Sequence, residues 1–182
     1  YVYFAQGDYS KALEYFEEVL KIRLSVYGEN HSRVASVYND IGEIYSVQGD
    51  DFKALDYFKK SLKIVLSVYG ENHSQVSSIY DHIGEIYFAQ KDYSKALYYF
   101  EESLKIRLSL FGENHPEVAL SYYSIGSLYI IQGDKSKALN YYEKSLKIRL
   151  SVYGENHPLT KEIMDLINVA NSKVLQSPET TK

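Results

Sequence analysis

Apolar residues recur along most of this chain at intervals of three and four positions, which is the period of one face of an α-helix. Val34, Val37, Ile41 and Ile44 keep this spacing, and polar residues fall between them. No apolar run reaches the roughly 18 residues that a membrane-spanning helix needs. The pattern predicts an all-α chain with short and long helices in turn, over residues 33–47, 52–69, 75–89 and 117–131.

The helical pattern repeats every 42 residues. Gly-Glu-Asn-His occurs four times, and Lys-Ala-Leu and Ile-Gly-x-x-Tyr recur in the same register. Each unit predicts one short and one long helix, and one such pair cannot cover its own apolar face. Stacked pairs can do so, which predicts a solenoid. The four copies of Gly-Glu-Asn-His begin at Gly28, Gly70, Gly112 and Gly154.

Small and polar residues predict where the helices of a unit begin, end and touch. Asp50 follows Gly49 and is suited to accept hydrogen bonds from the free N–H groups of the next helix. Gly70 is suited to a left-handed C-terminal cap. Gly42 and Ala54 leave room for two helices to approach closely, with Phe58 among the aromatic residues that fill the space around the contact.

These residues resemble the tetratricopeptide repeat. That family places aromatic and small residues at fixed places along 34 positions. The second unit supplies them as Tyr38, Ile41-Gly42, Tyr45, Gly49, Ala54 and Phe58. The 42-residue variety is similar to the repeats of kinesin light chains and nephrocystin-like proteins. The resemblance implies a right-handed superhelix of antiparallel helix pairs and a non-enzymatic protein-interaction module.

The resemblance also predicts how the chain is divided. The first residues align with the last turns of a first helix and the chain has no initial Met, so we expect a fragment of a longer array. We expect the end of a truncated helix and a turn over residues 1–8 and the repeat array over 9–157. A C-terminal capping helix is expected over residues 158–175, followed by a disordered tail over 176–182.

Composition narrows the classes of function. The 182 residues include 20 Tyr but no Cys, and the net charge is -4. Without cysteine there is no disulfide scaffold and no thiolate metal site. The acidic balance argues against nucleic acid as a partner. We expect a cytoplasmic chain that binds neither membranes nor cofactors.

The histidines favour a structural interpretation over a catalytic one. His31, His73, His115 and His157 occur once per unit, so neighbours lie on the order of 10 Å apart. Zinc ligands must lie about 2 Å from one ion, and a role in the turn is therefore favoured. No catalytic or phosphate-binding motif accompanies His82, the histidine outside this series, so we expect no enzyme. Asn30 and Asn72 match the N-glycosylation pattern, but without a leader peptide we expect no modification.

The charges separate by helix. In the family that these repeats resemble, the first helices line the concave face. Acidic residues dominate those helices here, with Arg33 as their one basic residue. We therefore expect an acidic inner face and a basic outer face. The basic residues expected outside are Lys59, Lys60, Lys63, Lys105, Arg107, Lys144, Lys147 and Arg149.

The resemblance places ten residues in a peptide-binding groove. The first two units offer acceptors and negative charge, and the next offers aromatic and aliphatic surface. The best electrostatic match is a protein or peptide of basic or mixed basic and apolar character. The groove residues are Asn39, Glu43, Ser46, Asp81, His82, Glu85, Phe88, Tyr123, Ser127 and Ile130.

Other interpretations stay open. The acidic face can be a solvated surface without a ligand, since charged faces keep proteins soluble. The array can also serve as a scaffold or spacer in a larger assembly, including end-to-end self-association. A third alternative is a regulatory repeat region of a multidomain protein.

Overall fold

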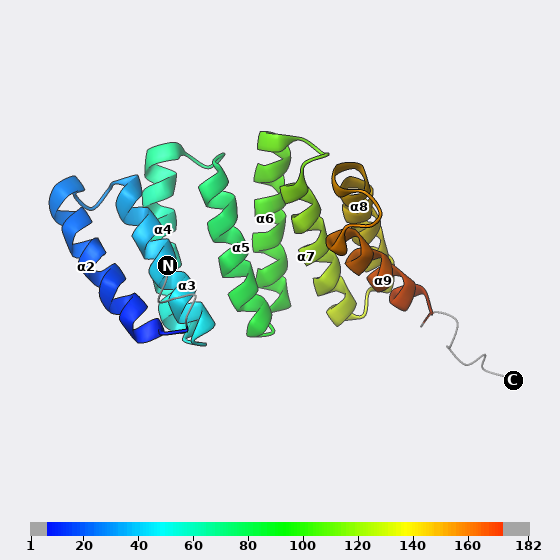
Figure 1. Cartoon of the computed structure of the whole chain (residues 1–182), viewed down its shortest axis with the longest axis horizontal. Helices are drawn as coiled ribbons and strands as arrows, with labels where there is room; N and C mark the ends of the chain where they lie inside the picture. Colours follow the sequence, from blue (N-terminus) through cyan, green and yellow to red (C-terminus); the bar gives the residue numbers. More distant parts are fainter. Residues whose placement is uncertain (1–6, 173–182) are drawn as a thin grey trace, which may run out of the picture. The chain divides into compact units, whose positions relative to one another are not determined.

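The computed structural model describes residues 7–172, and these contain eight α-helices and no strand (Figure 1). Residues 1–6 of the expected helix end and turn, residues 173–175 of the expected capping helix and the whole expected tail over 176–182 lie outside the described residues. None of the described helices is long and apolar enough to cross a membrane. The helices are α2 (Tyr9–Tyr27), α3 (Ser32–Val47), α4 (Asp51–Tyr69), α5 (Ser74–Ala89), α6 (Tyr93–Phe111), α7 (Pro116–Gln132), α8 (Lys135–Tyr153) and α9 (Pro158–Ser172).

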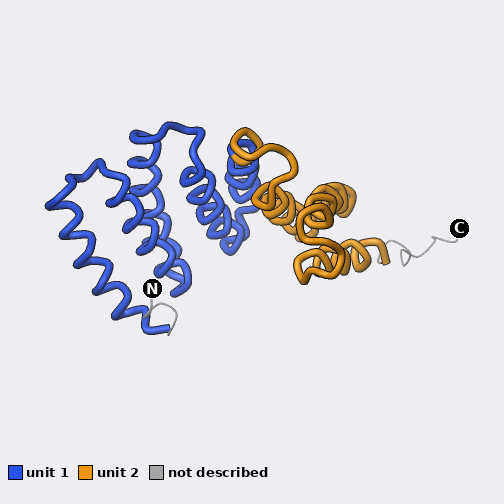
Figure 2. Tube along the Cα trace, turned by 45° about the horizontal axis from the view of Figure 1, so that its top comes forward, with its two compact units in different colours: residues 1–106 blue, residues 107–182 orange. Residues whose placement is uncertain are grey.

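The chain forms two compact units, Tyr1–Ile106 and Arg107–Lys182 (Figure 2). In the first unit α3 packs along α4, with α2 beside α3 and α5 beside α4. In the second unit α7 packs along α8, and α9 packs against α8. The predicted alternation of shorter and longer helices is confirmed.

A glycine and an aromatic ring form the contact between the helices of a pair. A Cβ atom added to Gly42 would lie 2.8 Å from Cε1 of Phe58, which is closer than real carbon contacts allow. The neighbouring Ala54 is buried as well. The close approach predicted at Gly42 and Ala54 is confirmed, and the same contact recurs between Gly84 and Phe100.

Aspartates begin the long helices as expected. The Asp50 side chain accepts a hydrogen bond from the backbone N–H of Lys53 at 3.2 Å, and Lys53 Nζ lies 3.0 Å from the same carboxylate. The same cap recurs at Asp8, Asp92 and Asp134. Satisfying these free N–H groups fixes the first turn of each long helix.

The end of the long helix corrects one expectation. Gly70 has φ 77° and ψ -176°, so its φ is positive but its ψ is extended rather than left-handed helical. This region is essentially restricted to glycine. The left-handed cap predicted at Gly70 is therefore wrong in detail, because the ψ of this residue lies outside the left-handed helical region.

A buried serine near the middle of the long helix ties it to its partner. Ser61 Oγ donates a hydrogen bond to the Ala35 carbonyl oxygen at 2.9 Å, and Ser145 Oγ donates to that of Ala119 at 2.7 Å. Ser103 occupies the same place in the repeat, but its buried Oγ has no hydrogen-bond partner. The three positions therefore share burial but not bonding.

Candidate functional site

The repeated histidines cap helices. His73 Nδ1 accepts a hydrogen bond from the backbone N–H of Gln75 at 3.2 Å, at the start of α5. Its ring stacks on Tyr69, with ring centroids 4.2 Å apart and planes 8° apart. The same two contacts recur at His31, His115 and His157. The structural role predicted for these histidines is confirmed, and the described residues hold no cluster able to bind a metal ion.

Helices α3 and α5 bring several of the predicted groove residues of the first unit together. Asn39 Nδ2 donates a hydrogen bond of 2.6 Å to Glu43 Oε1 within α3. His82 Nε2, from α5, lies 3.4 Å from the same oxygen. The three side chains therefore form one polar cluster, and His82 lies within ion-pair distance of the Glu43 carboxylate.

A buried ring supports this cluster. The imidazole of His82 is parallel to the Phe58 ring, with centroids 5.0 Å apart and planes 2° apart. Phe58 belongs to α4 and is the residue that contacts Gly42. The sequence indicated Phe58 only as a packing residue, and no motif pointed to its contact with His82.

The carboxylates of Glu43 and of the nearby Glu85 occupy an unfavourable environment. Partial burial raises the pKa of Glu43 above its ordinary value of 4.5, and the hydrogen bond from Asn39 opposes that rise. Desolvation by neighbouring protein groups also raises the pKa of Glu85, although the residue is exposed at the surface. His82 lowers this pKa, while the negative charges of Asp81 and Glu43 raise it further. These side chains are close enough to affect one another, so negative charge is concentrated here at neutral pH.

Ser46 and Phe88 lie at the C-terminal ends of α3 and α5. Ser46 is half-buried. Phe88 is half-buried too, and its ring packs edge-on to that of Tyr93 with centroids 5.9 Å apart. Phe88 therefore offers part of an aromatic surface on the same helix as Glu85.

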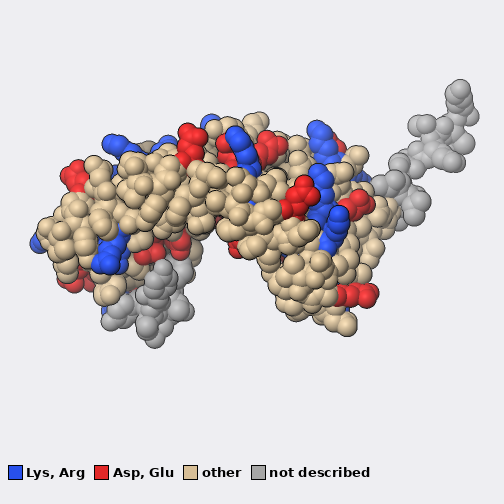
Figure 3. All heavy atoms as spheres, turned by 90° about the horizontal axis from the view of Figure 1, so that it is seen from above, with Lys and Arg blue, Asp and Glu red and all other residues tan. Residues whose placement is uncertain are grey.

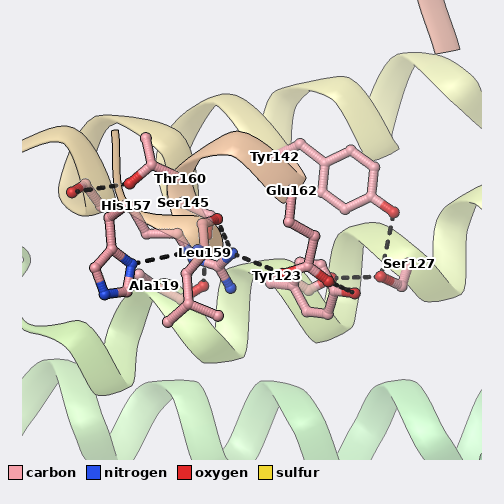
Figure 4. A network of polar contacts seen from close by, with 10 residues as sticks. Ala119, Tyr123, Ser127, Tyr142, Ser145, His157, Leu159, Thr160 and Glu162 are labelled. Carbon is pink, nitrogen blue, oxygen red and sulfur yellow. Dashed lines mark hydrogen bonds and ion pairs between the residues drawn. The ribbon is translucent and has the colours of Figure 1, made fainter. Parts of the chain in front are cut away.

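The remaining predicted residues, Tyr123, Ser127 and Ile130, lie on α7 in the second unit. Figure 4 shows Tyr123 and Ser127 among their polar contacts. The Tyr123 hydroxyl donates to Glu162 Oε1 at 3.0 Å, and its ring lies against that of Tyr142. Ser127 Oγ donates to the Tyr123 carbonyl oxygen at 2.9 Å and lies 3.1 Å from the Tyr142 hydroxyl. Ile130 is 37% exposed. Tyr123 and Ser127 are thus engaged within the chain, and Ile130 offers the apolar surface.

The expectation that Arg107 and Arg149 face outward is wrong, because each is only 4% exposed. Arg107 Nη2 lies 2.9 Å from Glu117 Oε2, and its Nη1 donates to Ser121 Oγ at 2.8 Å. The guanidinium is buried because oxygen atoms of the following helix satisfy it.

The long helix α4 carries charges of both signs. Lys59, Lys60 and Lys63 are exposed, as expected. Lys60 nevertheless pairs with Asp56 at 2.6 Å on the same helix. On the face shown in Figure 3, basic and acidic side chains are interspersed. The exposed surface of α4 is therefore not uniformly basic.

Comparison with known families identifies the class of this chain. The sequence profile of the tetratricopeptide repeat matches residues 1–67, 33–109 and 75–151. The chain belongs to the tetratricopeptide repeat family. The search of curated proteins finds no match.

Solved structures show the same fold at low sequence identity. The crystal structure of BtubC (BKLC) from P. vanneervenii has a TM-score of 0.79 at 20% identity, over 99% of this chain and 80% of that one. The nearly identical repeats of a putative kinesin light chain from Podosopora anserina give 0.73 at 16% identity, over 96% and 92%. The apo form of RapI gives 0.80 at 18% identity, over 96% of this chain and 61% of that one.

Proposed function

We propose that this chain is a non-enzymatic protein-interaction module that binds a basic segment of a partner protein along α3 and α5. Repeats of this family generally serve as protein-interaction modules. The observation that carries the proposal is the acidic cluster of Glu43, Asp81 and Glu85, two of whose members have a raised pKa. A cationic side chain of a partner relieves the cost of keeping these carboxylates charged.

The arrangement suits a preformed binding surface. The acidic residues stand on rigid helices whose packing is fixed by Phe58 and Gly42. A preformed surface loses little conformational entropy when a partner binds. Phe88 extends the surface of α5 with an aromatic ring, and on α7 we propose Tyr123 and Ile130 as the place for an apolar anchor.

The test compares binding before and after reversal of charge. A library of basic, neutral and acidic peptides is screened against the wild type and the Glu43→Lys/Glu85→Lys variant. We expect the wild type to select basic peptides, and we expect affinity to fall with added salt because exposed charges are screened. The charge-reversed variant should lose this selection.

A matched variant controls for net charge. Glu17 and Glu18 are exposed on α2, outside the proposed groove. The Glu17→Lys/Glu18→Lys variant changes the net charge by the same amount and should bind basic peptides like the wild type. Selection of acidic peptides, or equal binding by both double variants, would contradict the proposal.

A further inference from the structure

One position of the repeat holds an arginine in three of the four long helices and a valine in the remaining one, α4. Positions 23, 65, 107 and 149 are each 42 residues apart, and they hold Arg23, Val65, Arg107 and Arg149. The exception lies on α4, next to the acidic cluster of the first unit. The contacts of the three arginines show what this place in the fold normally contains.

Each arginine bonds to the first turns of the next helix. In addition to the contacts of Arg107 with Glu117 and Ser121, Arg149 Nη1 donates to the Leu159 carbonyl oxygen at 2.6 Å. Arg23 Nη1 donates to Ser36 Oγ at 2.8 Å. A helix N-terminus carries partial positive charge, which disfavours a cation. The position nevertheless accommodates a guanidinium, because side-chain and carbonyl oxygens accept its hydrogen bonds.

At Val65 the corresponding space is a cavity of about 170 Å³ between α3, α4 and α5. A single water needs only about 10–15 Å³ of such volume. Ser36, Asn39 and Asp40 line the cavity from α3, and Gln75 and Ser78 line it from α5. Ser78 is exposed, so the cavity lies at the surface.

Two acceptors among the lining residues are unpaired. Asn39 Oδ1 and Gln75 Oε1 are buried, and neither accepts a hydrogen bond. Gln75 stands 42 residues before Glu117, so it holds the place of the carboxylate that binds Arg107. Buried acceptors without a donor are costly and rare. The missing donor is thus the chemical group that Val65 lacks.

We propose that this cavity binds the guanidinium of an arginine supplied by the partner protein, which takes the place that Arg23, Arg107 and Arg149 fill elsewhere. The inference rests on the proposed function, and it specifies arginine rather than any cation. A planar guanidinium offers five donors in a fixed fork, which suits acceptors from two helices, whereas an ammonium is a compact, strongly hydrated charge. Asn39 also bonds Glu43, so the cavity adjoins the acidic cluster.

The probe that tests the cavity is N-ethylguanidinium, with ethylammonium and N-ethylurea as controls for charge and shape. The side-chain amide resonances of Asn39 and Gln75 are followed by NMR in isotope-labelled protein. We expect saturable shifts with N-ethylguanidinium, roughly tenfold weaker binding of ethylammonium, equal to ~1.4 kcal/mol, and no response to N-ethylurea. Equal responses to both cations, or none to N-ethylguanidinium, would overturn the proposal.

A second experiment fills the cavity with a larger side chain at position 65. Val65→Arg supplies the arginine found in the other three repeats, so this variant should fold and no longer bind the probe. Val65→Leu fills space without adding donors, and it keeps the test decisive if Val65→Arg fails to fold. We expect Val65→Leu to weaken the probe's binding by about tenfold, by occupying its volume. Undiminished probe binding by both variants would place the probe elsewhere.

The Glu85→Lys variant separates this inference from the proposed function. Glu85 does not line the cavity. We expect Glu85→Lys to weaken the binding of basic peptides and to leave the response of Gln75 to N-ethylguanidinium in place. If Glu85→Lys keeps its selection of basic peptides while the protein still responds to the probe, the proposed groove fails and the arginine site stands. Peptide selection that persists in Val65→Arg instead contradicts the arginine site alone.

Discussion

His82 lies flat on Phe58, with ring centroids 5.0 Å apart and ring planes 2° apart. The same Phe58 ring contacts Gly42, so one buried side chain of α4 supports both the backbone of α3 and the imidazole of α5. The stacking directs His82 Nε2 to within 3.4 Å of Glu43 Oε1. The contact of His82 with Glu43 is therefore supported by the hydrophobic core beneath it.

This relationship predicts energetic coupling between the two rings. A double-mutant cycle of His82→Ala and Phe58→Leu should give a coupling free energy of about 0.5–1.5 kcal/mol, the usual contribution of stacked rings beyond their burial. Urea unfolding of the four proteins measures it. Additive effects of the two substitutions would show that the stacking contributes nothing.

The raised pKa values of Glu43 and Glu85 predict a dependence of stability on pH. A carboxyl group whose pKa is higher in the folded chain holds its proton more tightly there, so the fold loses stability as pH rises from 4.5 through the raised pKa. Glu43→Gln/Glu85→Gln removes this loss. The free energy of unfolding of the variant minus that of its parent should therefore be larger at pH 7 than at pH 4.

Thermal unfolding at the two pH values measures that difference. Both proteins carry His82→Asn, so that titration of the imidazole beside Glu43 does not contribute. A relative stability of the variant that is the same at pH 4 and pH 7 would contradict the prediction.

The histidine caps predict a specific pattern of substitution. His73→Ala should lower the free energy of unfolding by about 1 kcal/mol, because the N–H of Gln75 loses its acceptor. His73→Asn keeps a good capping side chain and should recover most of that loss. Chemical denaturation compares the three proteins, and equal stability of the Ala and Asn variants would exclude a capping role.

The buried serines form a matched pair. Ser145→Ala removes the hydrogen bond to the Ala119 carbonyl and should cost about 0.5–1.5 kcal/mol. Ser103→Ala removes an equally buried hydroxyl that has no partner, so it should be neutral or stabilising. If the two substitutions prove equally costly in thermal unfolding, hydrogen bonding is not what distinguishes these sites.

The close approach of Gly84 and Phe100 predicts a rescue. Gly84→Ala places a Cβ atom 2.7 Å from the Phe100 ring and should cost about 1–3 kcal/mol by overpacking. Phe100→Leu removes the ring edge from that space, so in the double variant Gly84→Ala should cost much less. A cost that is unchanged in the Phe100→Leu background would mean that strain arises within α5 instead.

The repeat made most of the fold predictable, because local signals agree at each unit. Gly42 and Asp50 each indicate one contact that the structure contains, and Ala54 is buried as its place in the repeat indicates. The cluster of Glu43 with His82 depends on how α3 meets α5, and helical periodicity alone does not define that contact. The resemblance indicated the face, but the supporting stack on Phe58 emerged only from the packing.

The buried arginines show where the sequence misleads. A charged residue on an amphipathic helix is usually exposed, so Arg107 was expected outside, and only the oxygen atoms offered by α7 make its burial possible. Nothing in the sequence indicated a binding site at Val65 either, since valine is common on the apolar face of a helix. Its significance comes from comparison with the equivalent position in the other repeats.

The pairing of His73 with Tyr69 has an implication for how such chains change in length. Both residues belong to one junction, and the cap and ring stack involve only groups within a few residues of each other. Each connection between a long helix and the next short helix is thus stabilised by residues close to it in the sequence. Whole units can then be duplicated or deleted during evolution without disturbing the joints that remain.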